Sequence, residues 1–141
     1  MTAVETSRHR VAMSGSNEKI LRSFLALWST RDSRAMAEHF AENGVYDNVP
    51  DKRPMVGRDT IRQWLEMCFE HLTRIDVEVL NLASNGEWVV CERIDDHITG
   101  ERHMPLPVMN ATRIVDGKIR IFRDYYDRQT VKELGIGEAA T

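Results

Sequence analysis

Two short segments each place an Asp beside an Arg, and these residues could carry acid–base chemistry. They are Glu92-Arg93-Ile94-Asp95 and Phe122-Arg123-Asp124-Tyr125-Tyr126-Asp127. If both segments are strands, Arg93 and Asp95 share one face, because alternate side chains of a strand point to the same side. Asp124 can meet them from the second strand, whereas Arg123 should point away. Two carboxylates that share one guanidinium can hold one proton between them, which suits a reaction that needs an acid and a base together.

Tyr46 and Asn48 could add a place for a water molecule. They lie two residues apart in segment 45–49, which has the character of a short strand ending at Pro50. A hydroxyl and an amide beside a carboxylate can hold water by hydrogen bonds. The plainer interpretation of an Arg-x-Asp pair in a strand is a surface ion pair worth about 0–1 kcal/mol. Asp96 and Asp127 fit such a solvated or structural role.

The order of the predicted elements indicates how these residues are positioned. Apolar residues recur at helical spacing in 16–28, 36–40 and 60–72, and the first helix is expected to begin at Ser16 or Asn17. Alternation with period two then predicts strands from residue 74, over 88–98, 104–114 and 119–125, and a last helical turn over 129–134. Helices followed by an antiparallel meander predict an α+β fold. We expect a curved, mostly antiparallel sheet wrapped with three to four helices around a cone-shaped pocket.

Composition limits the class of protein. The chain has 141 residues, 42% hydrophobic and 29% charged, which is typical of one globular domain. We expect a flexible arm at 1–16, a single catalytic domain at 17–135 and a loose tail at 136–141. A net charge of -3 argues against a nucleic-acid partner, and no apolar stretch is long enough to span a membrane. Cys68 and Cys91 lack disulfide or metal-site spacing, which favours free thiols and a cytoplasmic protein.

The motifs together resemble the limonene-1,2-epoxide hydrolases. The residues that carry the resemblance span about 17–135, and they are Tyr46-Asp47-Asn48-Val49-Pro50, Gly57-Arg58-Asp59, Glu92-Arg93-Ile94-Asp95, Asp116-Gly117-Lys118-Ile119 and Arg123-Asp124-Tyr125-Tyr126-Asp127. Each motif is short, and their order and spacing make the match specific. The resemblance implies the cone-like fold of nuclear transport factor 2, with a six-stranded mixed sheet and a homodimer. It also implies that neither a metal nor a cofactor is needed.

The resemblance implies a role for each residue of the constellation. Asp124 looks like the general base that takes a proton from water, and Tyr46 and Asn48 look like the groups that hold this water. Asp95 looks like the acid that protonates the epoxide oxygen, and Arg93 like the bridge between the two carboxylates. A strained epoxide ring needs little beyond a positioned nucleophile and a proton for its oxygen. The implied activity is the hydrolysis of a small apolar or terpene-like epoxide to a vicinal diol.

The pocket that binds such a substrate should be dry and apolar. Leu106 and Val108 share a strand face and are the first candidates for its wall, followed by Tyr126 and by three helical residues, Met36, Leu65 and Phe69. His97 departs from the family pattern, which prefers a large apolar residue there. It could narrow or polarise the pocket, or it could reach solvent at the end of the strand.

Two other functions fit the same fold. A ketosteroid-isomerase-like proton shuttle also combines a Tyr with two carboxylic acids, but it has no use for Arg93. A noncatalytic module that binds small molecules is the alternative from another class, because one fold hosts many functions. Such a module has no need of the whole constellation.

Overall fold

The computed structural model describes residues 2–137. For residues 7, 9–12 and 14 within this range, it describes the backbone but not the side chain. Over this range the chain folds into four α-helices and a six-stranded sheet with strand order β2-β1-β6-β5-β4-β3. In chain order the elements are α1 (Ala3–Ala26), η1 (Leu27–Ser29), α2 (Ser33–Glu38), β1 (Phe40–Asn48), η2 (Val49–Asp51), β2 (Met55–Val56), α3 (Arg58–His71), β3 (Arg74–Asn85), β4 (Trp88–Thr99), β5 (Arg102–Val115), β6 (Lys118–Tyr125) and α4 (Arg128–Leu134). β1 and β6 run parallel and all other neighbours antiparallel, which confirms the α+β fold with a mixed, mostly antiparallel sheet.

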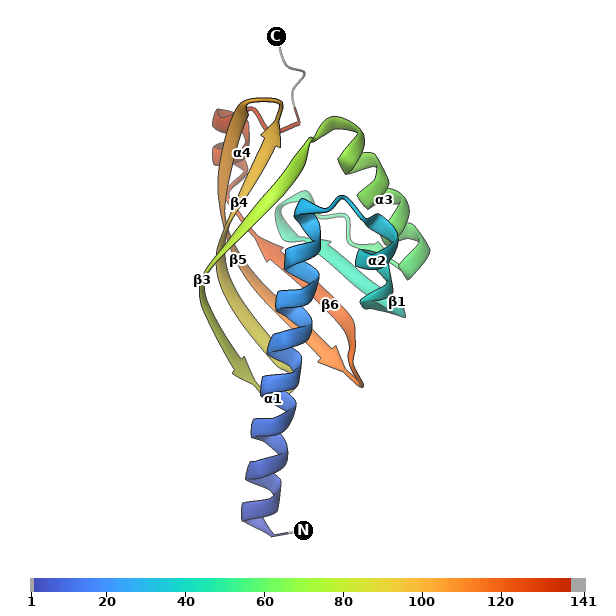
Figure 1. Cartoon of the computed structure of the whole chain (residues 1–141), viewed down its shortest axis with the longest axis vertical. Helices are drawn as coiled ribbons and strands as arrows, with labels where there is room; N and C mark the ends of the chain where they lie inside the picture. The colour runs from blue at the N-terminus through green and yellow to red at the C-terminus, as the bar shows by residue number, and fades with distance from the viewer. Residues whose placement is uncertain (1, 138–141) are drawn as a thin grey trace.

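Figure 1 shows how the helices close the curved sheet. α1 crosses one face of the sheet, α2 and α3 lie beside β1, and α4 lies at the end of the β4–β5 hairpin. The core between them is rich in aromatic rings. Phe24 of α1 meets Phe122 of β6 with ring centroids 5.0 Å apart, and Tyr46 lies 4.8 Å from both Phe122 and Trp64. This packing anchors the inner face of β1 and β6, the strands that carry Tyr46, Asn48 and Asp124.

The predicted start of the first helix, at Ser16 or Asn17, is wrong. The helix begins at Ala3, so residues 3–16, which we expected to form a flexible arm, are helical. The physical reason is a capping box at its start. The Thr2 amide donates to Glu5 Oε2 at 2.8 Å, and the Glu5 amide donates to Thr2 Oγ1 at 3.2 Å. Figure 1 shows this half of α1 extending beyond the sheet. Of the expected loose tail, residues 138–141 lie outside the described residues.

The strand predictions hold with shifted ends. β1 begins at Phe40, five residues before the predicted start, and takes up the end of the expected second helix. Pro105 and Pro107 lie in the part of β5 that pairs with β4 alone, because pairing with β6 begins at Met109. Proline, which has no backbone donor, is tolerated there. Asp116 and Gly117 form the turn of the β5–β6 hairpin, with φ of 50° and 77°.

No helix within residues 2–137 has the length and apolar character needed to cross a membrane.

Candidate active site

Four neighbouring strands place the predicted constellation on one face of the sheet. Asn48 of β1 is the register partner of Asp124 on β6, and Tyr46 is the partner of Phe122. Arg93 and Asp95 lie two residues apart on β4, with Val108 and Leu106 of β5 as their partners. Strand alternation therefore brings the five expected site residues, Tyr46, Asn48, Arg93, Asp95 and Asp124, to the same inner surface.

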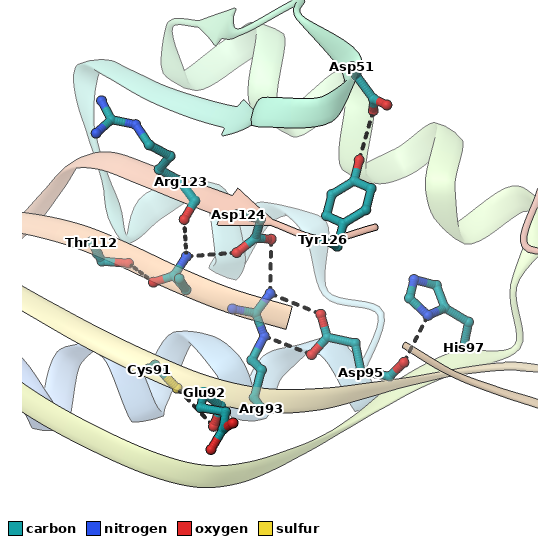
Figure 2. A network of polar contacts seen from close by, with 11 residues as sticks. Asp51, Cys91, Glu92, Arg93, Asp95, His97, Thr112, Arg123, Asp124 and Tyr126 are labelled. Carbon is teal, nitrogen blue, oxygen red and sulfur yellow. Dashed lines mark hydrogen bonds and ion pairs between the residues drawn. The ribbon is translucent and has the colours of Figure 1, made fainter. Parts of the chain in front are cut away.

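Arg93 lies between the two carboxylates and bonds both, as Figure 2 shows. Its Nε and Nη2 donate to the two carboxylate oxygens of Asp95 at 2.7 and 2.9 Å. Nη2 also donates to Asp124 Oδ2 at 2.9 Å, and the guanidinium carbon lies 5.4 Å from the centroid of the Phe122 ring. The Arg93 side chain is 1% exposed. A buried cation with two charge-assisted partners fixes the geometry of the pair.

The chain contains a second copy of the Arg-x-Asp sequence, with which the site can be compared. The tripeptide Arg-Ile-Asp occurs at 74–76 and again at 93–95. Arg74 and Asp76 form an ion pair on β3 whose side chains are 42% and 47% exposed, whereas Arg93 and Asp95 are 1% and 13% exposed. The first pair is the ordinary surface interaction, and the second lies at the wall of a cavity. Burial and the second carboxylate distinguish them, and neither can be read from the tripeptide.

Burial shapes the electrostatics of the site. It raises the pKa of Asp124 above its usual range, while Arg93 and Asn110 pull this pKa back down. Burial works against the charge of Arg93, but the two carboxylates outweigh it and raise the pKa of the guanidinium further. Burial also holds the pKa of Tyr46 well above its ordinary value, so its hydroxyl stays neutral and can donate a hydrogen bond. The site therefore combines a permanent cation, a neutral hydroxyl and two coupled acids.

Asn110 and Thr112 belong to this network and were not predicted. The Asn110 amide nitrogen donates to Asp124 Oδ1 at 2.7 Å and to the backbone carbonyl of Arg123 at 3.0 Å. Thr112 Oγ1 donates to Asn110 Oδ1. Both residues occupy inward positions of β5, in the series Met104, Leu106, Val108, Asn110, Thr112 and Ile114. Two polar residues at inward positions of an otherwise apolar strand were the signal that could have revealed them.

A cavity of about 1130 Å³ opens beside the two carboxylates. Its wall includes Tyr46, Asn48, Asp95 and Asp124, and four of the residues expected to contact substrate, Leu106, Val108, His97 and Tyr126. The remaining three are corrections. Met36 and Leu65 are fully buried and Phe69 is 4% exposed, and all three pack in the hydrophobic core rather than along the cavity. They belong to the core cluster that also contains Phe24 and Phe122. Helical periodicity identifies a buried face without showing whether it covers core or cavity.

The residues near the constellation whose roles the sequence left open lie in different environments. His97 lines the cavity, and its Nδ1 lies 3.0 Å from the backbone oxygen of Asp95. Arg123 points to the opposite face of β6, where its Nε lies 3.5 Å from Asp47. Asp96 accepts a bond from the Met104 amide, and Asp127 caps α4, so both neighbours of the site are structural.

Within residues 2–137, no cluster of three or more His, Cys, Asp or Glu side chains is placed to bind a metal ion.

Comparison with known proteins identifies a family whose sequences resemble this chain. Residues 15–134 match the family described as limonene-1,2-epoxide hydrolase catalytic domain. The chain is 26% identical over 107 residues to epoxide hydrolase EphG of Mycobacterium tuberculosis, an overlap that covers 76% of this chain and 70% of the relative.

Solved structures agree on the fold. An LEH-like epoxide hydrolase of Mycobacterium tuberculosis superposes with a TM-score of 0.77 and 21% identity, over 86% of this chain and 90% of the other. A protein from Catenulispora acidiphila with a ketosteroid isomerase-like fold gives a TM-score of 0.72 and 23% identity, over 79% and 88% of the two chains. At these identities the likeness concerns the fold. The match over residues 15–134 covers most of the chain, which therefore belongs to the limonene-1,2-epoxide hydrolase family.

Proposed function

We propose that the protein is a cofactor-free hydrolase that adds water in one step to a small apolar or terpene-like cyclic epoxide, giving a vicinal diol. Membership of a family of epoxide hydrolases gives the general activity. The observation that carries the finer proposal is the bridging of Asp95 and Asp124, which line a cavity, by buried Arg93. This arrangement offers a proton donor and a proton acceptor to one substrate at the same time.

In this proposal Asp124 is the base and takes a proton from a water held by Tyr46 and Asn48. The register pairing of Asn48 with Asp124 supports this assignment, because it places amide and carboxylate side by side at the cavity. The raised pKa of Tyr46 supports it too, since a neutral hydroxyl can donate to the water. The water oxygen forms the new C–O bond as its proton passes to Asp124.

Asp95 is the acid in this proposal. Its proton passes to the epoxide oxygen as the C–O bond of the ring breaks, so the leaving oxygen departs as a hydroxyl. Arg93 stays charged throughout and holds both carboxyl groups in place. After one turnover Asp124 carries the proton that Asp95 has lost. Transfer of that proton back to Asp95 through solvent in the cavity restores the starting state.

One part of the cavity wall supports an apolar substrate. Leu106 and Val108, the register partners of Asp95 and Arg93, line the cavity there, whereas polar and charged residues lie elsewhere on the wall. Tyr126 donates to Asp51 at 3.0 Å, which ties the wall to η2. We propose that the ring of the epoxide lies against Leu106 and Val108, with its oxygen toward Asp95.

Arg93 also weighs against the isomerase alternative. A proton shuttle of that kind needs an acid that stays neutral as a hydrogen-bond donor. A buried cation that bonds both Asp95 and Asp124 does not suit that requirement, and such a shuttle has no need of it.

We further propose a homodimer that works in the cytoplasm. Val90, Met109 and Tyr125 form an exposed apolar patch on the outer face of the sheet, at 39%, 49% and 47% exposure. Met109 and Tyr125 are direct register partners, so the patch is continuous across β5 and β6. An exposed apolar patch of this kind fits a second copy of the chain. The free thiols Cys68 and Cys91 suit a reducing compartment.

Diol formation from a panel of cyclic and terpene epoxides tests the proposed function. Asp95→Asn and Asp124→Asn should each lower turnover by about 10²-fold or more, since each removes one proton-transfer group. Asp76→Asn is the matched control, because Asp76 occupies the same position in the exposed Arg-Ile-Asp copy. It should keep the parental rate. Parental turnover by a folded Asp95→Asn or Asp124→Asn protein, checked by circular dichroism, would rule out the assigned roles.

A further inference from the structure

Burial and Arg93 together leave the two carboxyl groups unequal. The Asp124 side chain is 6% exposed and accepts one hydrogen bond from Arg93, whereas Asp95 is 13% exposed and accepts two. Burial penalises the ionised form of a carboxyl, and hydrogen bonds from a cation favour it. At Asp124 both differences count against the ionised form. A base must be ionised when the substrate arrives.

Asn110 supplies the missing donor to Asp124. Its amide nitrogen lies 2.7 Å from Asp124 Oδ1, the carboxylate oxygen that Arg93 leaves free. Asn110 is the register partner of Asp124 across β5 and β6, so the contact follows from the strand pairing. Asn110 is 1% exposed and does not contribute to the cavity wall. It can therefore act on the reaction only through Asp124.

Thr112 fixes the direction of the amide. The nitrogen of Asn110 faces two acceptors, Asp124 Oδ1 and the backbone carbonyl of Arg123, and a flipped amide would oppose its oxygen to that carbonyl. At the other end Thr112 Oγ1 donates to Asn110 Oδ1. Thr112 is fully buried, and its hydroxyl is oriented by this bond. Both hydrogens of the amide are thus committed to acceptors.

We propose that Asn110, oriented by Thr112, is a positioning residue that favours the ionised form of Asp124 and so supports its work as the base. This inference rests on the proposed function, because it concerns the carboxylate that the proposed function assigns as the base. Each carboxylate oxygen has two lone pairs, so Oδ1 can accept from Asn110 and still meet the reacting water. The same hydrogen bond weakens once Asp124 is protonated. It therefore favours return of the proton to Asp95 after each turnover.

Titration of Asp124 in the substrate-free protein tests the proposal. Carbon-13 NMR of Asp-labelled protein follows its carboxyl carbon, with the resonance assigned by its loss in Asp124→Asn. Asn110→Leu has a similar size and no donor, and it should raise the Asp124 midpoint by about one to two pH units, from the strength of a hydrogen bond to a charged group. Thr112→Val removes the orienting hydroxyl and should raise the midpoint by less. Thr112→Ser keeps a hydroxyl and should restore the parental value.

The pH dependence of catalysis should shift in the same direction as the Asp124 midpoint. The acidic limb of the pH profile of kcat/KM should move upward with the Asp124 midpoint in Asn110→Leu, and Asp76→Asn should leave it in place. An unchanged Asp124 midpoint in Asn110→Leu overturns the proposal. If Asn110→Leu does not fold, equal midpoints in Thr112→Val and Thr112→Ser overturn it. The titration needs no substrate, so a parent protein without epoxide turnover would refute the proposed function while the titration still decides the role of Asn110.

Discussion

Replacing Arg93 by Met should make the stability of the protein strongly dependent on pH. The change removes the cation that bonds both carboxylates and leaves Asp124, with a side chain only 6% exposed, without a charged partner. Removing one partner of a buried ion pair costs about 3–5 kcal/mol. With a urea m-value of about 2 kcal/mol/M, this loss lowers the unfolding midpoint by about 2 M at pH 8.

The direction with pH follows from Asp124. Burial already raises the pKa of Asp124 and Arg93 lowers it, so the variant has a still higher folded pKa. A carboxyl whose pKa is higher in the folded state loses stability as pH rises from its unfolded pKa, about 3.9, through its folded pKa. The deficit of Arg93→Met should therefore be largest at pH 8. It should shrink toward pH 5, by up to about 1.4 kcal/mol for each pH unit over which Asp124 is protonated only when folded.

Urea unfolding at pH 5 and pH 8, at one protein concentration and followed by tryptophan fluorescence, measures both effects. Arg74→Met is the matched control, because it breaks the exposed copy of the same tripeptide. This variant should lose about 0–1 kcal/mol at either pH. A loss in Arg93→Met no larger than in Arg74→Met, or a loss equal at the two pH values, would refute this reasoning.

Three further predictions concern the cavity, the core and the outer face. Leu106→Phe narrows the cavity beside Asp95, so kcat/KM should fall for bulky terpene epoxides and change little for cyclohexene oxide; equal losses for both would contradict the binding site. Met36→Ala opens a void in the core and should cost about 2–5 kcal/mol of unfolding free energy, while kcat/KM at temperatures where the protein is folded stays parental. Met109→Asp places a charge in the outer patch and should convert the proposed dimer to monomer in light scattering, with Glu101→Lys as a surface control; an unchanged mass would exclude that interface.

The fold could be predicted because its signals are local and repeated. The change from helical to two-residue periodicity at Arg74, the turn at Asp116-Gly117 and the two prolines of β5 each specify backbone geometry by themselves. The start of α1 was missed because Thr2 and Glu5 were taken with the polar residues that follow, although together they form a capping box. A short motif of that kind is easily overlooked when no apolar stripe follows it.

The site was predictable only in part, because it depends on contacts between strands. Strand alternation places Arg93 and Asp95 on one face, but it gives the same result for Arg74 and Asp76, which remain exposed. The register of β5 against β6 decides that Asn110 meets Asp124, and no local pattern reports this register.

The same limit explains the residues wrongly expected at the cavity. Met36, Leu65 and Phe69 are apolar and inward, which describes a core position and a pocket position equally well. The spacing of His97 puts it on the face of Asp95 but leaves open whether it reaches solvent, and in the structure it lines the cavity.

A single turnover in ¹⁸O-labelled water tests the central claim most directly. With enzyme in excess over a cyclic epoxide, direct attack by water activated by Asp124 predicts ¹⁸O in the diol formed in the first turnover. Mass spectrometry of the diol and of the peptides that contain Asp95 and Asp124 then locates the label. Unlabelled diol with ¹⁸O in either carboxylate would show a covalent ester intermediate and contradict the one-step addition of water.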